Sequence, residues 1–240
     1  MRSAIILAAG KGTRMKSALN KVMHPVSNKP MIGHIVCSLR KVGVDNIVVV
    51  VGHGAESVRE YLGDSVRYAV QEPQLGTGHA VMQAQCLADL DGDTLILNGD
   101  GPCIQSETID RVFAANADSE MTVLTAVLPD GERYGRIIRN AEGYVERIVE
   151  AKDCTPQELA VTEINTGIFC FKNRLLFAHL KEIRNDNAQQ EYYLTDLVAI
   201  FNQCGLRVNA LVADDPQETM GVNDRIDLAK AQKWMTRHEC

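Results

Sequence analysis

The stretch Ser3–Ala9 (SAIILAA), which leads into Gly10–Met15 (GKGTRM), is the most informative part of the sequence. Its apolar half has the composition of a buried parallel strand. The small residues at the end of that strand let backbone N–H groups approach a ligand closely, and anions bind where such groups converge. We therefore predict a strand that runs directly into an anion-binding loop.

The glycine-rich loop differs from two common phosphate-binding motifs. Met15 breaks the GxGxxG pattern of dinucleotide-binding proteins, and no GxxxxGK[ST] sequence is present. What remains is a loop with several cations: Arg14 lies within it, and Lys21 and Lys29 follow it. Such cations can hold a triphosphate, and Arg14 and Lys21 can neutralise charge that builds on a phosphoryl group under attack. The alternative is a tight turn whose charges are only solvated.

Downstream of this loop, apolar segments of the strand type alternate with segments of the helix type. The predicted strands are Asn46–Val51, Val66–Val70, Thr94–Asn98 and Met121–Val127. The predicted helices are a segment with Met31, Ile35, Leu39 and Val42 at helical spacing, Ala55–Leu62, Gly78–Leu87, and Ser106–Ala117 with a cap at Ser106. This alternation predicts a Rossmann-like, doubly wound and mostly parallel sheet, which binds ligands at the carboxyl ends of its strands.

The pattern changes after Pro129. Arg136–Asn140 and Tyr144–Glu150 flank Glu142-Gly143, which predicts an antiparallel hairpin and therefore a mixed sheet. The other predicted elements are strands at Glu163–Phe171 and near Arg207–Val212, and an amphipathic helix, Arg225–His238, with Ile226, Ala229, Lys230 and Trp234 near one face. We interpret this half as a substrate-binding lobe built onto the same sheet.

Composition and charge limit the class of protein. The 240 residues are 45% hydrophobic and 23% charged, which suits one large soluble domain. A net charge of −6 argues against nucleic acid or an anionic membrane surface as the main partner. No apolar run has the length of a signal peptide or a membrane span, and seven dispersed cysteines predict reduced thiols in the cytoplasm. No zinc-ligand spacing or GxSxG elbow is present.

Seven short motifs occur in an order and spacing that resembles the bacterial N-acetylglucosamine-1-phosphate uridylyltransferases. The resemblance extends from Ser3 to about Leu228. The motifs are the glycine-rich loop, Gln71 with Leu75-Gly76-Thr77-Gly78-His79-Ala80, Gly99-Asp100, Tyr134-Gly135, Ile148-Val149-Glu150, Glu163-Ile164-Asn165-Thr166-Gly167 and Gly221-Val222-Asn223. Each motif alone is moderately specific, whereas seven in sequence are very specific.

This resemblance implies a uridine site in the first half of the chain. The backbone of four residues would form its floor: Leu7, Ala8, Ala9 and Gly10. Gln71 would bond the uracil edge, because an amide offers a donor and an acceptor to the imide. Gly76 and Thr77 would complete the base and sugar contacts. Without its neighbours, a lone glutamine is more often a solvated loop residue.

The resemblance also implies a metal site and a sugar-phosphate site. Asp100, at the end of a predicted strand, and Asn223 would bind Mg²⁺, which prefers oxygen ligands. The alternative role for Asp100 is the cap of a helix or turn. The residues implied at the sugar-phosphate site are Gly135, Glu150 and Asn165, with Asn98 beside them.

Three departures from the family's pattern bear on these expectations. Relatives usually carry Tyr at the position of Asn98 and a branched apolar residue at that of Gly101, so the identity of the sugar stays open. Full-length relatives continue into a left-handed β-helix of hexapeptide repeats, which carries acetyltransferase activity and trimerises. No such repeat is present here, so we expect no β-helix domain, no acetyl transfer, and a monomer or weak dimer.

The sequence therefore predicts a nucleotidyltransferase domain over residues 1–228, with residues 229–240 as a C-terminal helix or the start of a linker. The reaction implied by the resemblance joins UTP and N-acetylglucosamine-1-phosphate with the help of Mg²⁺. It gives UDP-N-acetylglucosamine for peptidoglycan synthesis, and pyrophosphate, in the cytoplasm. Three alternatives stay open: glucose-1-phosphate or dTTP as a substrate, a catalytically inactive nucleotide-sugar-binding protein, and an assembly module based on the terminal helix.

Overall fold

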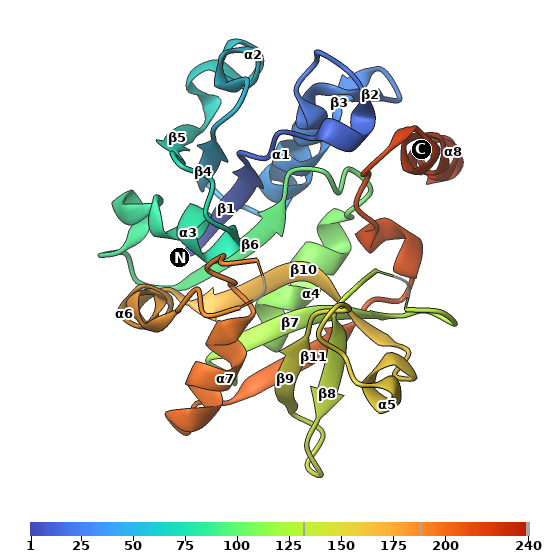
Figure 1. The fold of residues 1–240 in the computed structure, drawn as a ribbon. Coiled ribbons are helices and arrows are strands. Elements are labelled where there is room, and N and C mark those ends of the chain that lie inside the picture. The colour runs from blue at the N-terminus through green and yellow to red at the C-terminus, as the bar shows by residue number, and fades with distance from the viewer. Residues whose placement is uncertain (132, 188, 239–240) are drawn as a thin grey trace.

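A mixed sheet with helices on both faces forms the centre of the molecule (Figure 1). The structure, a computed structural model, describes residues 1–131, 133–187 and 189–238, and within them the sheet has nine strands. They are β1 (Arg2–Ala8), β4 (Asn46–Val51), β5 (Arg67–Val70), β6 (Asp93–Asn98), β7 (Met121–Val127), β8 (Arg136–Arg139), β9 (Val145–Val149), β10 (Glu163–Lys172) and β11 (Val208–Val212). The helices are α1 (Met31–Lys41), α2 (Ala55–Leu62), α3 (Thr77–Met82), α4 (Ser106–Ala115), α5 (Pro156–Leu159), α6 (Asn173–His179), α7 (Asp196–Gln203) and α8 (Arg225–His238).

Strand β1 lies in the parallel part of the sheet. It pairs with β4 on one side and with β6 on the other, so Ile5 lies opposite Val48 and Ile96. Strand β10 is inserted antiparallel between β6 and β7, and it also pairs with β8 of the β8–β9 hairpin. The strand order β11-β7-β10-β6-β1-β4-β5 confirms the predicted doubly wound, mixed sheet. A small hairpin of β2 (Pro25–Val26) and β3 (Lys29–Pro30) lies outside it.

Alternate side chains of β1 pack on opposite faces of the sheet because a strand has a period of two. Ala4 and Ile6 belong to a core shared with α1, α2 and α4, whereas Ile5 belongs to a core shared with α3, α6 and α7. Ile5 and Ile6 have no exposed surface. Burial on both faces explains why this strand is a nearly continuous apolar run.

The predicted helix Gly78–Leu87 is wrong in its second half. Helix α3 ends at Met82, and a separate 3-10 turn follows at Gln85–Leu87. In this turn the carbonyl oxygen of Leu87 accepts a hydrogen bond of 2.7 Å from Nδ2 of the buried Asn173. A tertiary hydrogen bond thus takes the place of a further helical turn.

Helix α4 begins at the predicted residue but without the predicted cap. Gln105 occupies the N-cap position and makes no side-chain cap bond, while Ser106 is the first helical residue. The Ser106 hydroxyl donates to the carboxylate of Glu107 at 3.0 Å. The capping role predicted for Ser106 is therefore wrong, because its hydroxyl is used by a neighbouring side chain.

The terminal helix α8 packs beside the β2–β3 hairpin with a different face from the predicted one. Trp234 is buried in a cluster with Val26 and Met31, and its Nε1 atom donates to Asp215 Oδ2 at 2.8 Å. Its predicted companions are exposed instead: Ile226, Ala229 and Lys230. The buried face of the helix consists of Ala231, Trp234 and Met235. The surface against which the helix packs decides which face is buried. The helix continues without a break across residue 228.

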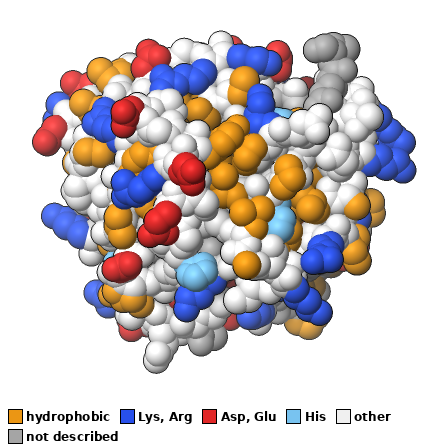
Figure 2. Space-filling view, turned by 90° about the horizontal axis from the view of Figure 1, so that it is seen from above, with side chains coloured by type: hydrophobic (Ala, Val, Ile, Leu, Met, Phe, Trp, Pro, Cys, Tyr) orange, Lys and Arg blue, Asp and Glu red, His pale blue; other side chains and the backbone are white. Residues whose placement is uncertain are grey.

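Figure 2 shows the end of the molecule that carries α2, the β2–β3 hairpin and α8. Apolar side chains lie there between charged side chains of both signs. Scattered apolar groups of this kind are ordinary on a protein surface. Within the ranges that the structure describes, no helix combines the length and the apolar character needed to cross a membrane.

Asn173→Ala is expected to destabilise the protein by about 2–4 kcal/mol, because it orphans several buried polar groups. Asn173 Nδ2 donates to the carbonyl oxygens of Leu87 at 2.7 Å and Leu90 at 2.6 Å, and its Oδ1 accepts from Thr94 Oγ1 at 2.6 Å. Urea unfolding measures the change. Asn209→Ala is the control, since Asn209 is only partly buried, donates a long bond of 3.5 Å to the carbonyl oxygen of Ala115 and accepts one from the neighbouring Ala210 N at 2.9 Å. A loss no larger than that of the control would contradict the expectation.

Candidate active site

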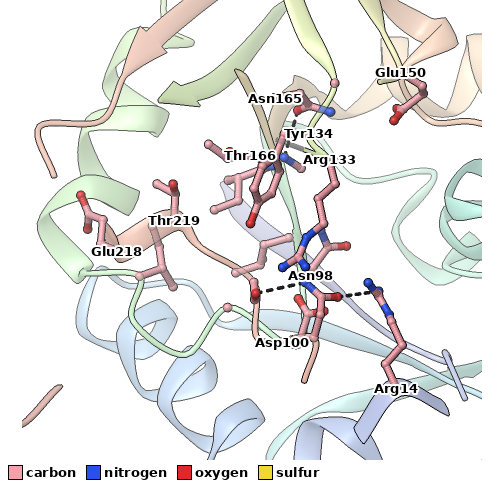
Figure 3. A pocket seen from close by; sticks show the side chains of 18 residues that line it. Arg14, Asn98, Asp100, Arg133, Tyr134, Glu150, Asn165, Thr166, Glu218 and Thr219 are labelled. Atoms are coloured by element: carbon pink, nitrogen blue, oxygen red, sulfur yellow. Dashed lines mark hydrogen bonds between the residues drawn. The ribbon is translucent and has the colours of Figure 1, made fainter. Parts of the chain in front are cut away.

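Two adjoining cavities lie at the carboxyl ends of β1 and β6, where open α/β sheets bind their ligands. The first has a volume of about 380 Å³ and is drawn in Figure 3, and the second has a volume of about 350 Å³. Asn98 and Asp100 line both cavities. The two cavities therefore form one cleft.

The residues that the sequence suggests for a site line this cleft, except Lys29, which lines a different cavity; their roles stay predictions. The first cavity is lined by Arg14, Asn98, Asp100, Gly135, Glu150, Asn165 and Asn223. The second is lined by Leu7, Ala8, Ala9, Gly10, Lys21, Gln71, Gly76 and Thr77, with Asn98 and Asp100 shared. Segments that are distant in sequence meet here because several strands end at the same edge of the sheet.

The loop after β1 offers mainly backbone to the second cavity. A Cβ atom on Gly10 would meet no atom within 4 Å, so this residue borders open space. The carbonyl oxygen of Ala9 accepts hydrogen bonds from Gln74 Nε2 and, at 3.4 Å, from His53 N. These bonds hold the loop, and a flat group can approach the small residues without a side chain in its way.

Gln71 follows β5 and is only 4% exposed. Its Nε2 atom donates to the carbonyl oxygen of Gly76 at 2.9 Å and lies 3.2 Å from His79 Nδ1. One hydrogen of the amide is therefore bonded within the chain, to the carbonyl oxygen of Gly76, and the His79 ring nitrogen accepts the other only in the tautomer that leaves Nδ1 unprotonated. No described group donates to the carbonyl oxygen of Gln71, so this oxygen is the acceptor that Gln71 can offer to a ligand.

The loop that precedes α3 is held by a later segment of the chain. Tyr192 N donates to the carbonyl oxygen of Leu75 at 2.8 Å, and Thr77 Oγ1 accepts from Leu194 N at 3.0 Å. Gly76 has a φ of +104°, and a Cβ atom there would lie 2.7 Å from the carbonyl oxygen of Tyr192. Glycine is required at this position for both reasons.

A bulge in β10 shapes the first cavity. The pairing of β10 with β7 shifts between Asn165 and Ile168, and Gly167 within the bulge has a φ of +79°. A Cβ atom on Gly167 would lie 2.5 Å from Asn98 Nδ2. Asn165 N donates to the carbonyl oxygen of Gly135 at 2.8 Å. The bulge changes the direction of the strand. It thus places Gly167 against Asn98, and Asn165 beside Gly135.

Glu150, just after β9, is a partly buried carboxyl group on the first cavity. Burial raises its pKa, and the nearby carboxylates of Asp153 and Asp196 raise it further. A carboxylate in such a place is stabilised by hydrogen-bond donors that replace lost water. Figure 3 shows Glu150 and Asp100 at opposite ends of the cavity.

The oxygen atoms of two side chains converge where the cavities meet. Lys21 Nζ donates to Asp100 Oδ2 and, at 3.0 Å, to Asn223 Oδ1. Arg14 Nη2 donates to the same oxygen of Asn223 at 2.8 Å. The side chains of Lys21 and Asp100 are 14% and 19% exposed, so water screens their charges only partly. Four residues singled out by the sequence therefore form one network.

Backbone contacts explain how Asn223 reaches the end of β6. Val222 N donates to the carbonyl oxygen of Asp100 at 2.9 Å. Gly221 packs against the carboxylate, since a Cβ atom there would lie 3.2 Å from Asp100 Oδ1. Asn223 Nδ2 donates to the carbonyl oxygen of Gly221 at 3.1 Å, which turns Oδ1 toward Lys21.

The paired oxygens of Asp100 and Asn223 suit a hard divalent cation. Mg²⁺ takes oxygen ligands and keeps several waters, so one carboxylate and one amide are a sufficient contribution from the protein. Both oxygens contact the Lys21 ammonium, which shows that they can share one cation. Among the described residues, no group of three or more histidine, cysteine or acidic side chains could hold a metal.

Several polar residues of the cleft are not among those that the sequence predicts. They are Gln74 and Glu191 in the second cavity, and Arg133, Glu218 and Thr219 in the first. Glu218 is 3% exposed, and its carboxylate accepts from Thr108 Oγ1 at 2.8 Å. Burial raises its pKa. Two of them have a sequence signal, because Gln74 directly precedes Leu75-Gly76-Thr77 and Arg133 directly precedes Tyr134-Gly135.

Comparisons with known proteins agree with the motifs and the cleft. A family model for the MobA-like NTP transferase domain matches residues 4–199. The bifunctional protein GlmU of Limosilactobacillus reuteri is 53% identical over 237 residues, which are 98% of this chain and 52% of the relative. GlmU of Geobacillus thermodenitrificans is 51% identical over 242 residues, which are 100% of this chain and 53% of the relative. The chain spans about half the length of these curated relatives.

A solved structure shares the fold. It is a Bacillus anthracis protein, crystallised with sucrose, whose name is that of a glucose-1-phosphate thymidylyltransferase. The TM-score is 0.77 at 22% identity, and the match covers 97% of this chain and 94% of the other. At 22% identity, the similarity shows that the two proteins share the arrangement of the sheet and helices. The family model and the relatives of similar sequence confirm the resemblance that the motifs indicate.

Gly76→Ala is expected to lower the unfolding free energy by about 2–4 kcal/mol, because a methyl group adds backbone strain and meets the carbonyl oxygen of Tyr192. Urea unfolding measures the loss, and limited proteolysis reports whether the loop loosens. The control is Gly143→Ala, where φ is +88° and a Cβ atom meets nothing within 4 Å. It should lose only about 1–2 kcal/mol from the left-handed backbone. Equal losses in both variants would show that the contact with Tyr192 adds nothing.

Proposed function

The chain belongs to the MobA-like NTP transferase family, and from this premise we propose that it is a sugar-1-phosphate uridylyltransferase. The reaction would join UTP to N-acetylglucosamine-1-phosphate and release pyrophosphate. The observation that carries the proposal is the convergence of Asp100, Asn223 and Lys21 at the junction of two cavities. Two anionic substrates can meet there, one from each cavity.

The second cavity suits a uridine nucleotide. The backbone after β1 gives a flat floor, and the carbonyl oxygen of Gln71 can accept the imide hydrogen of uracil. Cytosine carries no hydrogen on that ring nitrogen, so this acceptor favours uracil. The phosphates of the nucleotide would extend from this cavity toward Lys21 and Arg14, which lie at the junction.

The first cavity suits a phosphorylated sugar. Glu150 offers an acceptor to sugar hydroxyls at one end, and Asn165 offers an amide beside the backbone of Gly135. Gly101 leaves open space, since a Cβ atom there would have its nearest contact at 3.9 Å. This space can accept a bulky substituent on the sugar, which agrees with an N-acetyl group more than with a bare hydroxyl.

In-line displacement at the α-phosphate needs two things from the chain. The cleft must hold the attacking sugar phosphate oxygen opposite the leaving pyrophosphate, and it must offset the charge of two anions. Arg14 and Lys21 carry positive charge to the point where the cavities meet. Asp100 and Asn223 would hold Mg²⁺, which supplies further charge neutralisation and orientation when bound. The substrate's own oxygen is the nucleophile, so no covalent enzyme intermediate is required.

We also propose that the protein works in the cytoplasm as a monomer or weak dimer. The dispersed cysteines suit a reducing compartment, and four of the six that the structure describes are at least partly exposed. The small number of large exposed apolar side chains supports a surface in contact with water. Light scattering of the pure protein over a range of concentrations measures the oligomeric state, and a stable trimer would contradict this part of the proposal.

A grid of substrates tests the proposed reaction. The purified chain is assayed for pyrophosphate release with Mg²⁺, using UTP, CTP or dTTP together with N-acetylglucosamine-1-phosphate, glucosamine-1-phosphate or glucose-1-phosphate. We expect the highest kcat/KM for UTP with N-acetylglucosamine-1-phosphate. A higher value for dTTP or for glucose-1-phosphate would reassign the substrates. Binding of UDP-N-acetylglucosamine without any pyrophosphate release would instead indicate an inactive nucleotide-sugar-binding protein.

Gln71→Ala is expected to raise the KM for UTP and to weaken discrimination against CTP. One lost hydrogen bond to a buried base costs about 1–3 kcal/mol, which corresponds to roughly fivefold to 150-fold in kcat/KM. The control is Gln85→Ala, because Gln85 is exposed and donates only to the carbonyl oxygen of Met82. Steady-state kinetics with both nucleotides measure the change. Unchanged nucleotide preference in Gln71→Ala would remove this residue from the base site.

Asp100→Asn and Asn223→Ala are expected to differ in their dependence on Mg²⁺. Asp100→Asn removes the formal charge of the metal site, so kcat should fall more than a hundredfold at any practical Mg²⁺ concentration. Asn223→Ala removes one neutral ligand, so activity should fall about 10–100-fold and recover partly as Mg²⁺ is raised. The control is Asp110→Asn, since Asp110 is exposed and pairs with Arg2 away from the cleft. Normal kcat and metal dependence in Asp100→Asn would remove the metal from the proposal.

A further inference from the structure

Arg133 lines the first cavity and has no role in the reaction described above. Its Nη2 atom donates to Asp227 Oδ2 at 2.8 Å, and its guanidinium carbon lies 5.8 Å from the centre of the Tyr134 ring. Figure 3 shows the side chain extending into the cavity. The side chain is 40% exposed, so the ion pair with Asp227 contributes little to stability.

Arg14 is bonded to Asn223 directly, and Arg133 is linked to it through Asp227. Arg14 donates directly to its side-chain oxygen at 2.8 Å. Asp227 Oδ2 accepts two hydrogen bonds, one from Arg133 at 2.8 Å and one from the backbone N–H of Asn223 at 3.0 Å. A phosphate group bound beside Asn223 in the first cavity would therefore lie near both guanidinium groups.

The charge of the first cavity supports a role for this second guanidinium. Asp100, Glu150 and Glu218 line it with carboxylates, which oppose the entry of an anion. Among the described residues that line it, the cationic side chains are Arg14 and Arg133. Arginine presents several N–H donors in a planar fork, so one edge can bind Asp227 while the other binds a phosphate.

We propose that Arg133 is a further substrate-binding residue that contacts the phosphate of the sugar-1-phosphate, and that Asp227 holds its guanidinium in place. The inference rests on the proposed function, because that function puts a sugar phosphate in the first cavity. It also assigns a specificity: the contact favours phosphorylated sugars over free sugars and leaves nucleotide binding unchanged.

The test compares four variants with the intact chain: Arg133→Met, Arg133→Lys, Asp227→Asn, and Arg147→Met as the matched control. Arg147 lies on β9 in the same lobe and pairs with Glu158 outside the cleft. The KM values for N-acetylglucosamine-1-phosphate and for UTP are measured separately. Calorimetry with N-acetylglucosamine-1-phosphate, in the presence of saturating UMP, gives a Kd that does not depend on turnover. Free N-acetylglucosamine serves as the uncharged comparison, and thermal unfolding checks each fold.

Arg133→Met should weaken sugar-phosphate binding about tenfold or more and leave the KM for UTP within twofold. Arg133→Lys should lose less, because it keeps the charge, and Arg147→Met should match the intact chain. Asp227→Asn should lose at most a few-fold, since it keeps the shape that holds the guanidinium. Unchanged binding in Arg133→Met overturns the proposal. An equal loss of affinity for free N-acetylglucosamine in Arg133→Met also overturns it, because the contact would then not be with the phosphate.

If the intact chain releases no pyrophosphate, the proposed function fails, yet the calorimetric comparison still decides the role of Arg133. Binding of the sugar phosphate that falls in Arg133→Met would keep the contact while the reaction is reassigned. No measurable binding of the sugar phosphate to the intact chain would overturn both proposals. The two failures are therefore distinguishable.

Discussion

The contact of Lys21 with both Asp100 and Asn223 is the interaction on which the cleft depends. The loop after β1, the end of β6 and the segment before α8 each supply one of the three residues. A carboxylate that is largely removed from water needs a cation and hydrogen bonds to be tolerated. This contact therefore joins the end of β6 to the segment before α8, and it lies at the boundary between the two cavities.

The two halves of the cleft are built by different means. The parallel strands supply mainly backbone, because their ends carry small residues and the carbonyl and N–H groups are near the open space beside Gly10. The antiparallel strand β10 supplies the side chain of Asn165, whose Oδ1 atom accepts a hydrogen bond from Gly167 N at 2.9 Å within the bulge. A flat base and a hydroxyl-rich sugar need different surfaces. Insertion of one antiparallel strand into a parallel sheet provides both.

Predictions that depended on local patterns held best. The bounds of β4, α2, β7 and α8 agree with the predicted ones, since each has a strong apolar period or a clear end. Predictions failed where a distant residue intervened. Asn173 takes up the carbonyl oxygen of Leu87 and replaces a helical turn, and the face of α8 follows the surface around Trp234 instead of its own pattern. The resemblance also identified residues that line the cleft, but not Arg133 or Glu218, which belong to no quoted motif.

The sequence by itself determined the class of sheet, the alternation of its elements and the set of motif residues, because these depend on periodicity and on short runs of small or charged residues. Only the tertiary structure decided which atoms those residues use. Gln71 binds its own loop through Nε2 and keeps its carbonyl oxygen for a ligand, and Asp227 joins Arg133 to Asn223 across distant parts of the chain. Such choices depend on distances of about 3 Å between segments, and a linear pattern contains no information on them.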